Sequence, residues 1–249
     1  MKIISWNLNG LEDRYLDERT EAAMFQILLG APIEAVMSEG FKPNSPDIVV
    51  LQEVVERTYH AHIVPHFKAA GFSVFPPEPS ERSYFEVVAV RCKKRSGKID
   101  ATYLPFEYSQ QGRGLTMLKV NGLTVMTAHL ESMKPGKAMR IDQAQFILNE
   151  MQKYDHCIFA GDTNLRTEEW DNLEYGNIKD AWNSVDSPEK HRTTWQYENR
   201  KSRFDRVWTH QLDILNFETF GKGNIVSTNE RPSDHLGLRV EFNQLLLQK

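Results

Sequence analysis

Short apolar runs that lead directly into polar side chains recur along the whole chain. Residues 47–52 form one such run, which follows the breaker Pro46 and leads into Glu53. Residues 157–160 form another, which leads through Gly161 into Asp162. Short β-branched runs between breakers favour buried β-strands. Because function is usually mounted where loops leave a rigid sheet, the polar residues at these strand ends are candidate site residues.

Periodicity predicts many strands and few helices. The expected strands are residues 2–7, 47–52, 72–75, 85–91, 99–107, 114–120, 123–128, 157–160, 203–208, 212–217 and 237–242. The expected helices are residues 16–37, broken at Gly30 and Pro32, 57–70, ended by Gly71, and 135–154. Asn121-Gly122 predicts a hairpin, and residues 163–202 are expected to be mostly loop and short helix.

This pattern favours an α/β fold in which two mixed sheets pack face to face with helices outside. The 249 residues contain neither an obvious linker nor a short repeat, so we expect a single domain over 1–249 and a monomer. The hydrophobic content of 40% and the charged content of 26% are typical of a folded globular protein.

Several classes of protein are disfavoured by composition. The net charge of −4 argues against a protein that grips long duplex DNA, and the basic cluster Arg91, Lys93, Lys94, Arg95 and Lys98 is interpreted as a solvated turn. No window approaches 18 consecutive apolar residues, so we expect no membrane span. The N-terminus lacks the pattern of a signal peptide, and Cys92 and Cys157 are interpreted as reduced core thiols. We therefore expect an intracellular location.

The residues at the strand ends supply the groups that phosphoester hydrolysis needs. They are Asn7, Glu53, His129, Asp162, Asn164, Asp205, Asp234 and His235. Mg²⁺ takes oxygen ligands and is held by one or two carboxylates together with substrate phosphate, and Mn²⁺ is an alternative ion. Hydrolysis also requires a carboxylate that orients water and donors around the phosphoryl oxygens. The sequence has no cysteine cluster for zinc and no phosphate-binding loop of the G-x-x-x-x-G-K-[ST] type.

Each of these residues alone has an ordinary structural interpretation. Glu53 can be an exposed strand-end acid, Gly161-Asp162 can form a turn, and His129 can be a satisfied buried histidine. Trp195 is more often a packing residue than a stacking platform, and Arg140 is more often a solvated helix charge. The ordered occurrence of the whole set at strand ends is what favours a catalytic site.

Five segments, in order, resemble the motifs of the endonuclease/exonuclease/phosphatase superfamily and span residues 3–242. They are Trp6-Asn7, Leu51-Gln52-Glu53-Val54, Thr127-Ala128-His129-Leu130-Glu131-Ser132, Gly161-Asp162-Thr163-Asn164 and Ser233-Asp234-His235. Within the superfamily, Gly161-Asp162-Thr163-Asn164-Leu165-Arg166, Thr194-Trp195 and Arg203-Phe204-Asp205-Arg206 look most like the tyrosyl-DNA phosphodiesterase 2 branch. The resemblance implies a four-layer α/β/β/α sandwich with the site across one rim of both sheets.

The resemblance also implies roles in catalysis. Glu53 would bind Mg²⁺, helped by Asn7 and Asp234. Asp162 would orient and deprotonate the attacking water, and Asn164 would hold the phosphate. His129 and His235 would donate to the phosphoryl oxygens, and Asp205 would fix the tautomer of His235.

Substrate contacts are implied in the same way. Trp195 resembles a residue that packs against the 5′ nucleotide, with Arg206 stacked on it as a cation–π pair. Arg140 and Arg166 would meet phosphates, and Ser132 would add a donor. The expected partner is a single-stranded 5′ end of nucleic acid, tyrosyl-linked in the closest branch, which agrees with the acidic total charge.

Two alternatives stay open. The chain could be another phosphoesterase of the superfamily, such as a nuclease, a sphingomyelinase-like enzyme or a phosphoinositide phosphatase. It could also be a catalytically inactive binding protein of the same fold. The presence of Glu53, Asp162, Asn164, Asp234 and His235 together argues against the second alternative, because a binding scaffold does not need all five.

Overall fold

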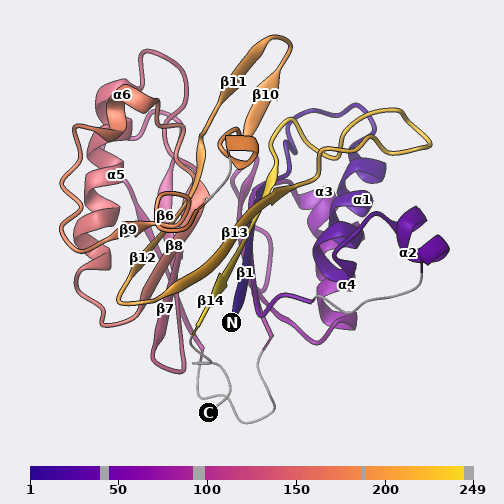
Figure 1. The fold of residues 1–249 in the computed structure, drawn as a ribbon, viewed down its shortest axis with the longest axis horizontal. Helices are drawn as coiled ribbons and strands as arrows, with labels where there is room; N and C mark the ends of the chain where they lie inside the picture. Colours follow the sequence, from indigo (N-terminus) through magenta and orange to yellow (C-terminus); the bar gives the residue numbers. More distant parts are fainter. Residues whose placement is uncertain (40–44, 92–98, 187–188, 244–249) are drawn as a thin grey trace.

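Two six-stranded sheets lie face to face in the centre of the molecule, and helices cover their outer faces (Figure 1). The computed structural model describes residues 1–39, 45–91, 99–186 and 189–243. The arrangement confirms the predicted four-layer α/β/β/α sandwich of two mixed sheets. Both sheets are mixed because β1 pairs with β2 in parallel in the first, and β7 with β8 in the second, while the other pairs are antiparallel.

The two sheets have simple strand orders. The first runs β13 (Ile214–Phe220), β14 (Gly237–Phe242), β1 (Lys2–Asn7), β2 (Ile48–Val54), β4 (Phe85–Val90) and β3 (Ser73–Phe75). The second runs β5 (Asp100–Pro105), β6 (Gly114–Val120), β7 (Leu123–Thr127), β8 (Cys157–Asp162), β12 (Asp205–His210) and β9 (Lys179–Asp180). The predicted Asn121-Gly122 hairpin joins β6 to β7, and both turn residues have the positive φ that such a turn requires.

Helices flank both sheets. One outer face carries α1 (Leu16–Leu29), α2 (Ile33–Glu39), α3 (Glu56–Thr58), the π-helix η1 (Tyr59–Ile63) and α4 (Val64–Ala69). The other carries α5 (Lys137–Met151) and α6 (Thr167–Trp170). Gly30 ends α1 in the left-handed conformation, as the predicted break at Gly30 requires.

Three apolar layers hold the sandwich together. The central layer joins the two sheets through fully buried aliphatic side chains, among them Ile3, Val50, Val88, Val125, Ile158 and Val240. Separate layers join the first sheet to α1, η1 and α4, and the second sheet to α5. Burying each such aliphatic side chain contributes roughly 1.5–3 kcal/mol relative to exposure. The strand ends above these layers are therefore fixed to a rigid base.

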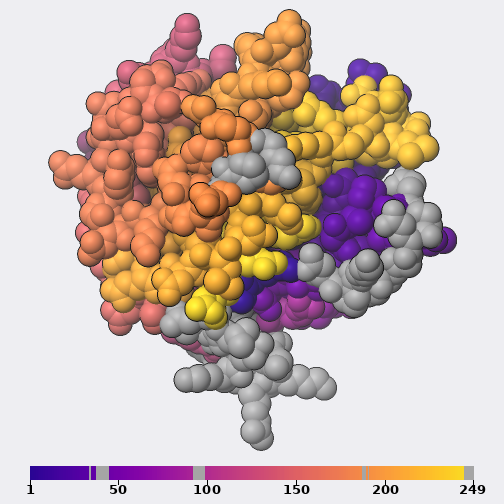
Figure 2. Space-filling view, viewed as in Figure 1, coloured from indigo at the N-terminus to yellow at the C-terminus, as the bar shows by residue number. Residues whose placement is uncertain are grey.

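The prediction for residues 163–202 was incomplete. A two-stranded hairpin, β10 (Trp195–Tyr197) with β11 (Arg200–Ser202), lies inside this stretch, as do β9 and the 3₁₀ helix η2 (Glu189–His191). The hairpin rises above the ends of the two sheets and projects from the top of the molecule (Figures 1 and 2). Its strands are three residues long and largely polar, so they lack the alternation that identifies longer strands.

Three smaller expectations concern cysteine, basic residues and membrane spans. Cys157 is a free, fully buried thiol in β8, as predicted, whereas Cys92 lies outside the described residues. In the basic cluster, Arg91 donates to the carbonyl oxygens of Ser45 and Pro46, and the other four members lie outside the described residues. Among the described residues, no helix has the length and apolar character needed to cross a membrane.

Candidate active site

The residues predicted to take part in catalysis and metal binding lie at one end of both sheets. Asn7 ends β1, Asp162 ends β8, and Asp205 begins β12 directly opposite Asp162. His129 forms an isolated bridge with Asp162. Across the rim the residues follow one another in pairs, with one member of each pair from each sheet. The order is Tyr84 with Arg113, Glu53 with His129, Asn7 with Asp162, and His235 with Asp205. The Trp195 hairpin comes last, beside His235. The site therefore has two distinct ends.

The Asn7 amide lies at the centre of this rim. Its Nδ2 donates to Glu53 Oε1 at 3.1 Å and to Asp162 Oδ2 at 3.0 Å. Its Oδ1 accepts from the backbone N–H of Asn9 at 2.9 Å, which fixes the orientation of the amide. One buried side chain thus holds together carboxylates that are 109 positions apart in the sequence.

Backbone features that the sequence reasoning missed allow this close approach. A Cβ on Gly10 would lie 2.0 Å from Glu53 O, and a Cβ on Gly161 would lie 2.3 Å from Ala128 O. Glu53 and Asn164 have φ values of 53° and 51°, in the left-handed region that non-glycine residues rarely adopt. Such conformations persist only where surrounding structure determines them, and they concentrate at functional sites.

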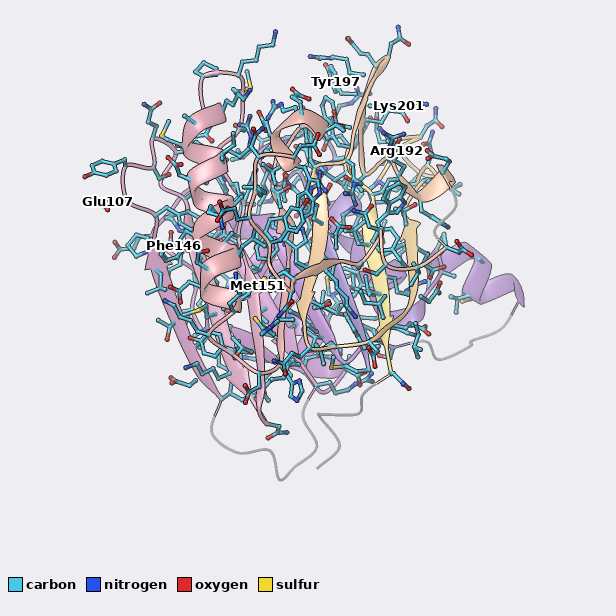
Figure 3. All side chains as sticks on the ribbon, turned by 60° about the vertical axis from the view of Figure 1, so that its left-hand side comes forward. Glu107, Phe146, Met151, Arg192, Tyr197 and Lys201 are labelled. Carbon is cyan, nitrogen blue, oxygen red and sulfur yellow. The ribbon has the colours of Figure 1, made fainter. Side chains whose placement is uncertain are left out.

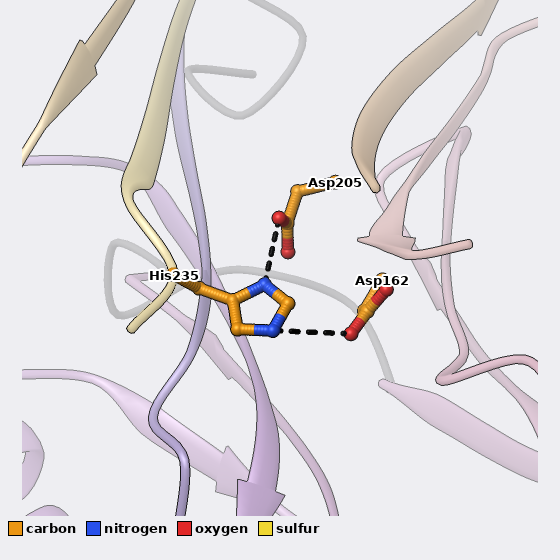
Figure 4. A group of neighbouring side chains, drawn as sticks. All are labelled: Asp162, Asp205 and His235. Carbon is orange, nitrogen blue, oxygen red and sulfur yellow. Dashed lines mark hydrogen bonds and ion pairs between the residues drawn. The ribbon is translucent and has the colours of Figure 1, made fainter. Parts of the chain in front are cut away.

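His235 is held between two carboxylates (Figure 4). Its Nδ1 lies 2.8 Å from Asp205 Oδ2, and its Nε2 lies 3.7 Å from Asp162 Oδ2. Burial alone would lower the pKa of His235, but the charges of Asp205 and Asp162 raise it to about 10. Burial raises the pKa of Asp205 to about 6, still below neutral pH. At pH 7 the pair is therefore an imidazolium and a carboxylate.

His129 occupies the opposite side of Asp162 and differs in charge. Its Nε2 lies 3.3 Å from Asp162 Oδ2, and its Nδ1 lies 3.7 Å from Glu53 Oε1. Burial lowers the pKa of His129 to about 3, so its imidazole is neutral at pH 7. Burial also opposes ionisation of Asp162, yet its pKa is lowered by the charged His235 and by hydrogen bonds from Asn7 and the Asn164 N–H.

Asp234 combines one engaged oxygen with one free oxygen. Its Oδ2 accepts from Trp195 Nε1 at 2.7 Å, whereas its Oδ1 is buried and has no hydrogen-bond partner. An unsatisfied buried carboxylate oxygen is costly unless a cation or donor meets it. Glu53 is nearly buried as well, and burial raises its pKa. These two carboxylates fit an oxygen-liganded divalent ion such as Mg²⁺.

Asp162, Asp205 and His235 form a second arrangement that could hold a metal. One potential ligand atom from each lies within 4.8 Å of the others, the one cluster of this kind in the described residues. His235 already uses Nδ1 on Asp205, and the proximity follows from that ion pair. An imidazolium between two carboxylates leaves no lone pair for an ion.

Thr194 and Ser233 lie within the motif segments, and the structure shows that they support the site, a role that the sequence did not indicate. Thr194 Oγ1 accepts from the backbone N–H groups of Phe204 and Asp205, both at 3.0 Å. Ser233 Oγ donates to Asn7 O at 2.7 Å and accepts from the His235 N–H at 3.0 Å. Both hydroxyls are buried, and each fixes backbone beside a candidate catalytic residue.

Tyr84 and Arg113 are further side chains that the sequence reasoning missed. The Arg113 guanidinium lies over the Tyr84 ring at 4.9 Å, and the Tyr84 ring lies 6.1 Å from that of His129. Arg113 is 3% exposed, and its Nε and Nη1 have no hydrogen-bond partner. Its Nε also lies 3.9 Å from Glu131 Oε2, so this buried cation is paired with a buried carboxylate while Nε and Nη1 keep donor capacity at the end of the rim.

The structure corrects the interpretation of Arg140. This side chain is fully buried on α5, and its guanidinium makes a bidentate pair with Glu169 at 2.9 and 2.6 Å. Its Nη1 also donates to the carbonyl oxygens of Glu131 and Met133. A phosphate cannot reach donors that are buried and already bonded, so Arg140 joins α5 to α6 and does not face substrate.

Arg206 also differs from its prediction. It pairs with Asp180 at 3.2 Å and lies over Trp170 at 4.6 Å, so it does not stack on Trp195. The cation over the Trp195 ring is instead Arg200, at 5.9 Å. Asp180 pairs with both Arg203 and Arg206, and this pairing holds the Arg206 guanidinium away from Trp195.

The remaining predicted contacts lie nearer the rim. Arg166 is partly buried, donates to Asn164 O at 2.6 Å and lies over Phe204. Asn164 uses its side-chain amide on Leu130 O at 3.2 Å. The Ser132 hydroxyl exchanges hydrogen bonds with Gln111. Whether Arg166, Asn164 and Ser132 touch substrate stays a prediction.

The hairpin gathers aromatic and basic side chains beside Trp195. The Trp195 and Tyr197 rings are nearly parallel, with centroids 6.5 Å apart, and Tyr197 is 50% exposed. Tyr197 and Lys201 project from the hairpin, and Arg192 lies beside it (Figure 3). A cavity of about 440 Å³ adjoins Asp234 and includes Tyr197 and Arg231 in its wall. This end of the site suits bases and phosphates.

Comparison with known proteins places this geometry among relatives. The profile of the Endonuclease/Exonuclease/phosphatase family matches residues 4–235. Tyrosyl-DNA phosphodiesterase 2 of Mus musculus is 30% identical over 278 residues, which cover 99% of this chain and 67% of that protein. The 5′-tyrosyl-DNA phosphodiesterase of Caenorhabditis elegans is 28% identical over 97% of this chain and 67% of its own length. The crystal structure of truncated TDP2 from C. elegans is 27% identical, with a TM-score of 0.79 and coverage of 97% and 96%.

Proposed function

Because the chain belongs to the endonuclease/exonuclease/phosphatase family, we propose that it is a Mg²⁺-dependent phosphodiesterase acting on 5′ ends of DNA, of the 5′-tyrosyl-DNA type. The names of the relatives support this proposal, since they are tyrosyl-DNA phosphodiesterases. The observation that carries it is the contact of Asn7 with both Glu53 and Asp162, which joins the two sheets at one polar centre.

Asp162 is the proposed general base. Its lowered pKa keeps it ionised, and its position beside Asn7 and His235 fixes the carboxylate. In the proposed reaction the water oxygen attacks phosphorus while Asp162 accepts a proton from that water. The bond between phosphorus and the tyrosyl oxygen breaks, and the phenolate leaves. General-base positioning of this kind contributes about 10²–10⁴-fold to rate.

His235 is the proposed donor to the phosphoryl oxygens. Its Nε2 is 3.7 Å from Asp162 Oδ2, outside hydrogen-bond range, so the N–H is available to an incoming oxygen. Asp205 holds the opposite nitrogen and stabilises the charged ring. His129, neutral and with Nδ1 unpartnered, is the second proposed group at the phosphate, and Asn164 the third.

Glu53 and Asp234, with Asn7, are the proposed residues for Mg²⁺, and Mn²⁺ has the same ligand preference. The bound ion would neutralise charge that builds on the phosphoryl oxygens. The free Asp234 Oδ1 supports this assignment, because it is a buried acceptor without a partner.

The substrate is proposed to cross the rim in one direction. The nucleotide would lie at the Trp195 end, where the hairpin, Arg166 and the cavity beside Asp234 offer stacking and donors. The leaving group would lie at the opposite end, where the Arg113 guanidinium, paired with Glu131, lies over the Tyr84 ring. A single-stranded 5′ end requires few phosphate contacts, in line with the net charge of −4. We further propose a monomeric, single-domain, intracellular enzyme.

A parallel assay of substrates tests this proposal. A 5′-phosphotyrosyl oligonucleotide, an abasic duplex, sphingomyelin and a phosphoinositide are incubated with the protein and Mg²⁺, and again with EDTA. We expect Mg²⁺-dependent release of tyrosine from the first, lost in Asp162→Asn. Preferred cleavage of another substrate would assign a different phosphoesterase activity. No cleavage of any substrate would leave an inactive binding protein of this fold.

A further inference from the structure

A cavity of about 590 Å³ opens where the edges of the two sheets separate. Its wall takes side chains from β3 and β4 of the first sheet and from β5 and β6 of the second. Most of the wall is apolar, with contributions from Phe75, Pro76, Pro77, Ala101 and Tyr103. None of these side chains takes part in the site described above.

Glu86 gives this apolar cavity a polar floor. The residue is 1% exposed, and its Oε2 accepts from Arg82 Nη2 at 2.7 Å. Its Oε1 is buried without a hydrogen-bond partner. Glu78 and Glu81 also line the cavity, and the one cation among the lining residues is Arg82, whose guanidinium lies over the Tyr103 ring at 4.6 Å. An unpaired buried oxygen in an acidic, apolar cavity fits a cationic donor with an aliphatic stem.

The cavity continues the rim beyond the proposed leaving-group end. Glu86 follows Tyr84 by two residues, and the Tyr103 hydroxyl donates to Gly112 O at 3.3 Å, next to Arg113. The Trp195 hairpin lies on the other side of the rim, where Trp195 bridges His235. A group that leaves toward Tyr84 therefore leaves toward this cavity.

We propose that the cavity binds the polypeptide attached to the leaving tyrosine, through one lysine or arginine side chain that reaches Glu86 Oε1. The inference rests on the proposed function, because a polypeptide joined to the leaving tyrosine would continue past the scissile bond on this side of the rim. The apolar wall packs the stem of the basic side chain, and the carboxylate accepts a charge-assisted hydrogen bond.

Three substrates that share one oligonucleotide test the proposal. They carry a free tyrosine, a tyrosine peptide with a neighbouring lysine, and the same peptide with glutamate in place of lysine. We expect a KM about tenfold lower for the lysine peptide than for the other two, as for a charge-assisted hydrogen bond. Fluorescence polarisation of the labelled lysine peptide in EDTA gives binding independently of turnover.

Two variants and two matched controls locate the effect. Glu86→Gln removes the charge, and Ala101→Trp fills the cavity from an exposed position on the edge strand β5. Both should abolish the preference for the lysine peptide and leave kinetics on the free-tyrosyl substrate unchanged. Glu174→Gln and Ala138→Trp make the same changes at exposed positions elsewhere and should retain it.

Equal KM values for all three substrates in the unaltered protein would overturn the proposal, as would a preference that survives in both cavity variants. Failure of the proposed function has a different signature, because the free-tyrosyl oligonucleotide would then not be hydrolysed. In that case polarisation of the lysine peptide still decides whether the cavity binds it.

Discussion

The indole Nε1 of Trp195 donates to Asp234 Oδ2 at 2.7 Å, so the proposed nucleotide platform directly fixes a proposed metal ligand. The backbone strengthens this link, because Trp195 bridges His235 and the Gln196 N–H donates to Asp234 O at 3.0 Å. Contact of a base with Trp195 and binding of an ion by Asp234 are therefore coupled through one side chain.

Replacing Trp195 with phenylalanine separates these two roles. Phe retains an aromatic face but loses the N–H donor, so we expect the Mg²⁺ concentration for half-maximal activity to rise about threefold to tenfold, as for loss of a hydrogen bond to a charged group. The KM for oligonucleotide should change little. Calorimetric Mg²⁺ binding and steady-state kinetics measure the two effects.

Trp182→Phe is the matched control, because Trp182 Nε1 is buried without a partner and its loss removes no hydrogen bond. An unchanged Mg²⁺ affinity in Trp195→Phe would contradict the coupling.

Asp162→Asn should lower kcat on the order of 10³-fold or more, because the amide cannot accept a proton from water. Asn retains an oxygen that can accept from the Asn164 N–H, so the fold should persist. Stopped assays report kcat, and thermal melting reports folding. A variant with near-normal kcat would exclude Asp162 as the base.

Stability should depend on pH through His235. Its pKa is about 10 in the folded protein against about 6.5 unfolded, so the folded state binds the proton more tightly. The resulting stabilisation is fully present below pH 6.5 and is lost as the pH rises towards 10. Asp205, with a pKa of about 6, titrates below this window.

We therefore expect the free energy of unfolding to fall from pH 7 to pH 10 by on the order of 1 kcal/mol or more, and Asp205→Asn to reduce this fall. Denaturant titrations at pH 7, 8.5 and 10 measure it. The exposed Asp171→Asn serves as the control. Parallel pH curves for Asp205→Asn and the unaltered protein would refute the assignment.

Arg140→Ala should destabilise the fold by about 3–5 kcal/mol, because it leaves Glu169 as an uncompensated buried charge. The kinetics of the folded fraction should be unchanged, since Arg140 does not face substrate. Replacing Arg140 and Glu169 together by Met and Leu should recover part of the stability. A raised oligonucleotide KM with normal stability would restore the phosphate-binding interpretation.

Strand ends were the most informative part of the sequence. Asn7, Glu53 and Asp162 lie at the ends of buried strands, and His235 directly precedes one, so the pairing of these strands brings all four to one rim. The sheet architecture and the long helices were predictable because periodicity is a local property.

Pairing between distant side chains was not predictable. Arg140 looks like a solvent-facing cation or a phosphate contact in the sequence, and Arg206 was expected to stack on Trp195. Only the tertiary structure brings Glu169 and Asp180 to them. Tyr84 and Arg113 carry no motif of their own, because their significance comes from stacking at the end of the rim. Gly10 was missed because it must be glycine only on account of the Glu53 carbonyl, which belongs to β2 and is distant in the sequence.

The most direct test is a crystal structure of the protein with Mg²⁺ and a 5′-phosphorylated oligonucleotide. We expect one ion bound by Glu53 and Asp234, with the 5′ phosphate between His129 and His235 and the first base against Trp195. An ion held by Asp162 and Asp205, or a phosphate bound away from His235, would contradict this expectation.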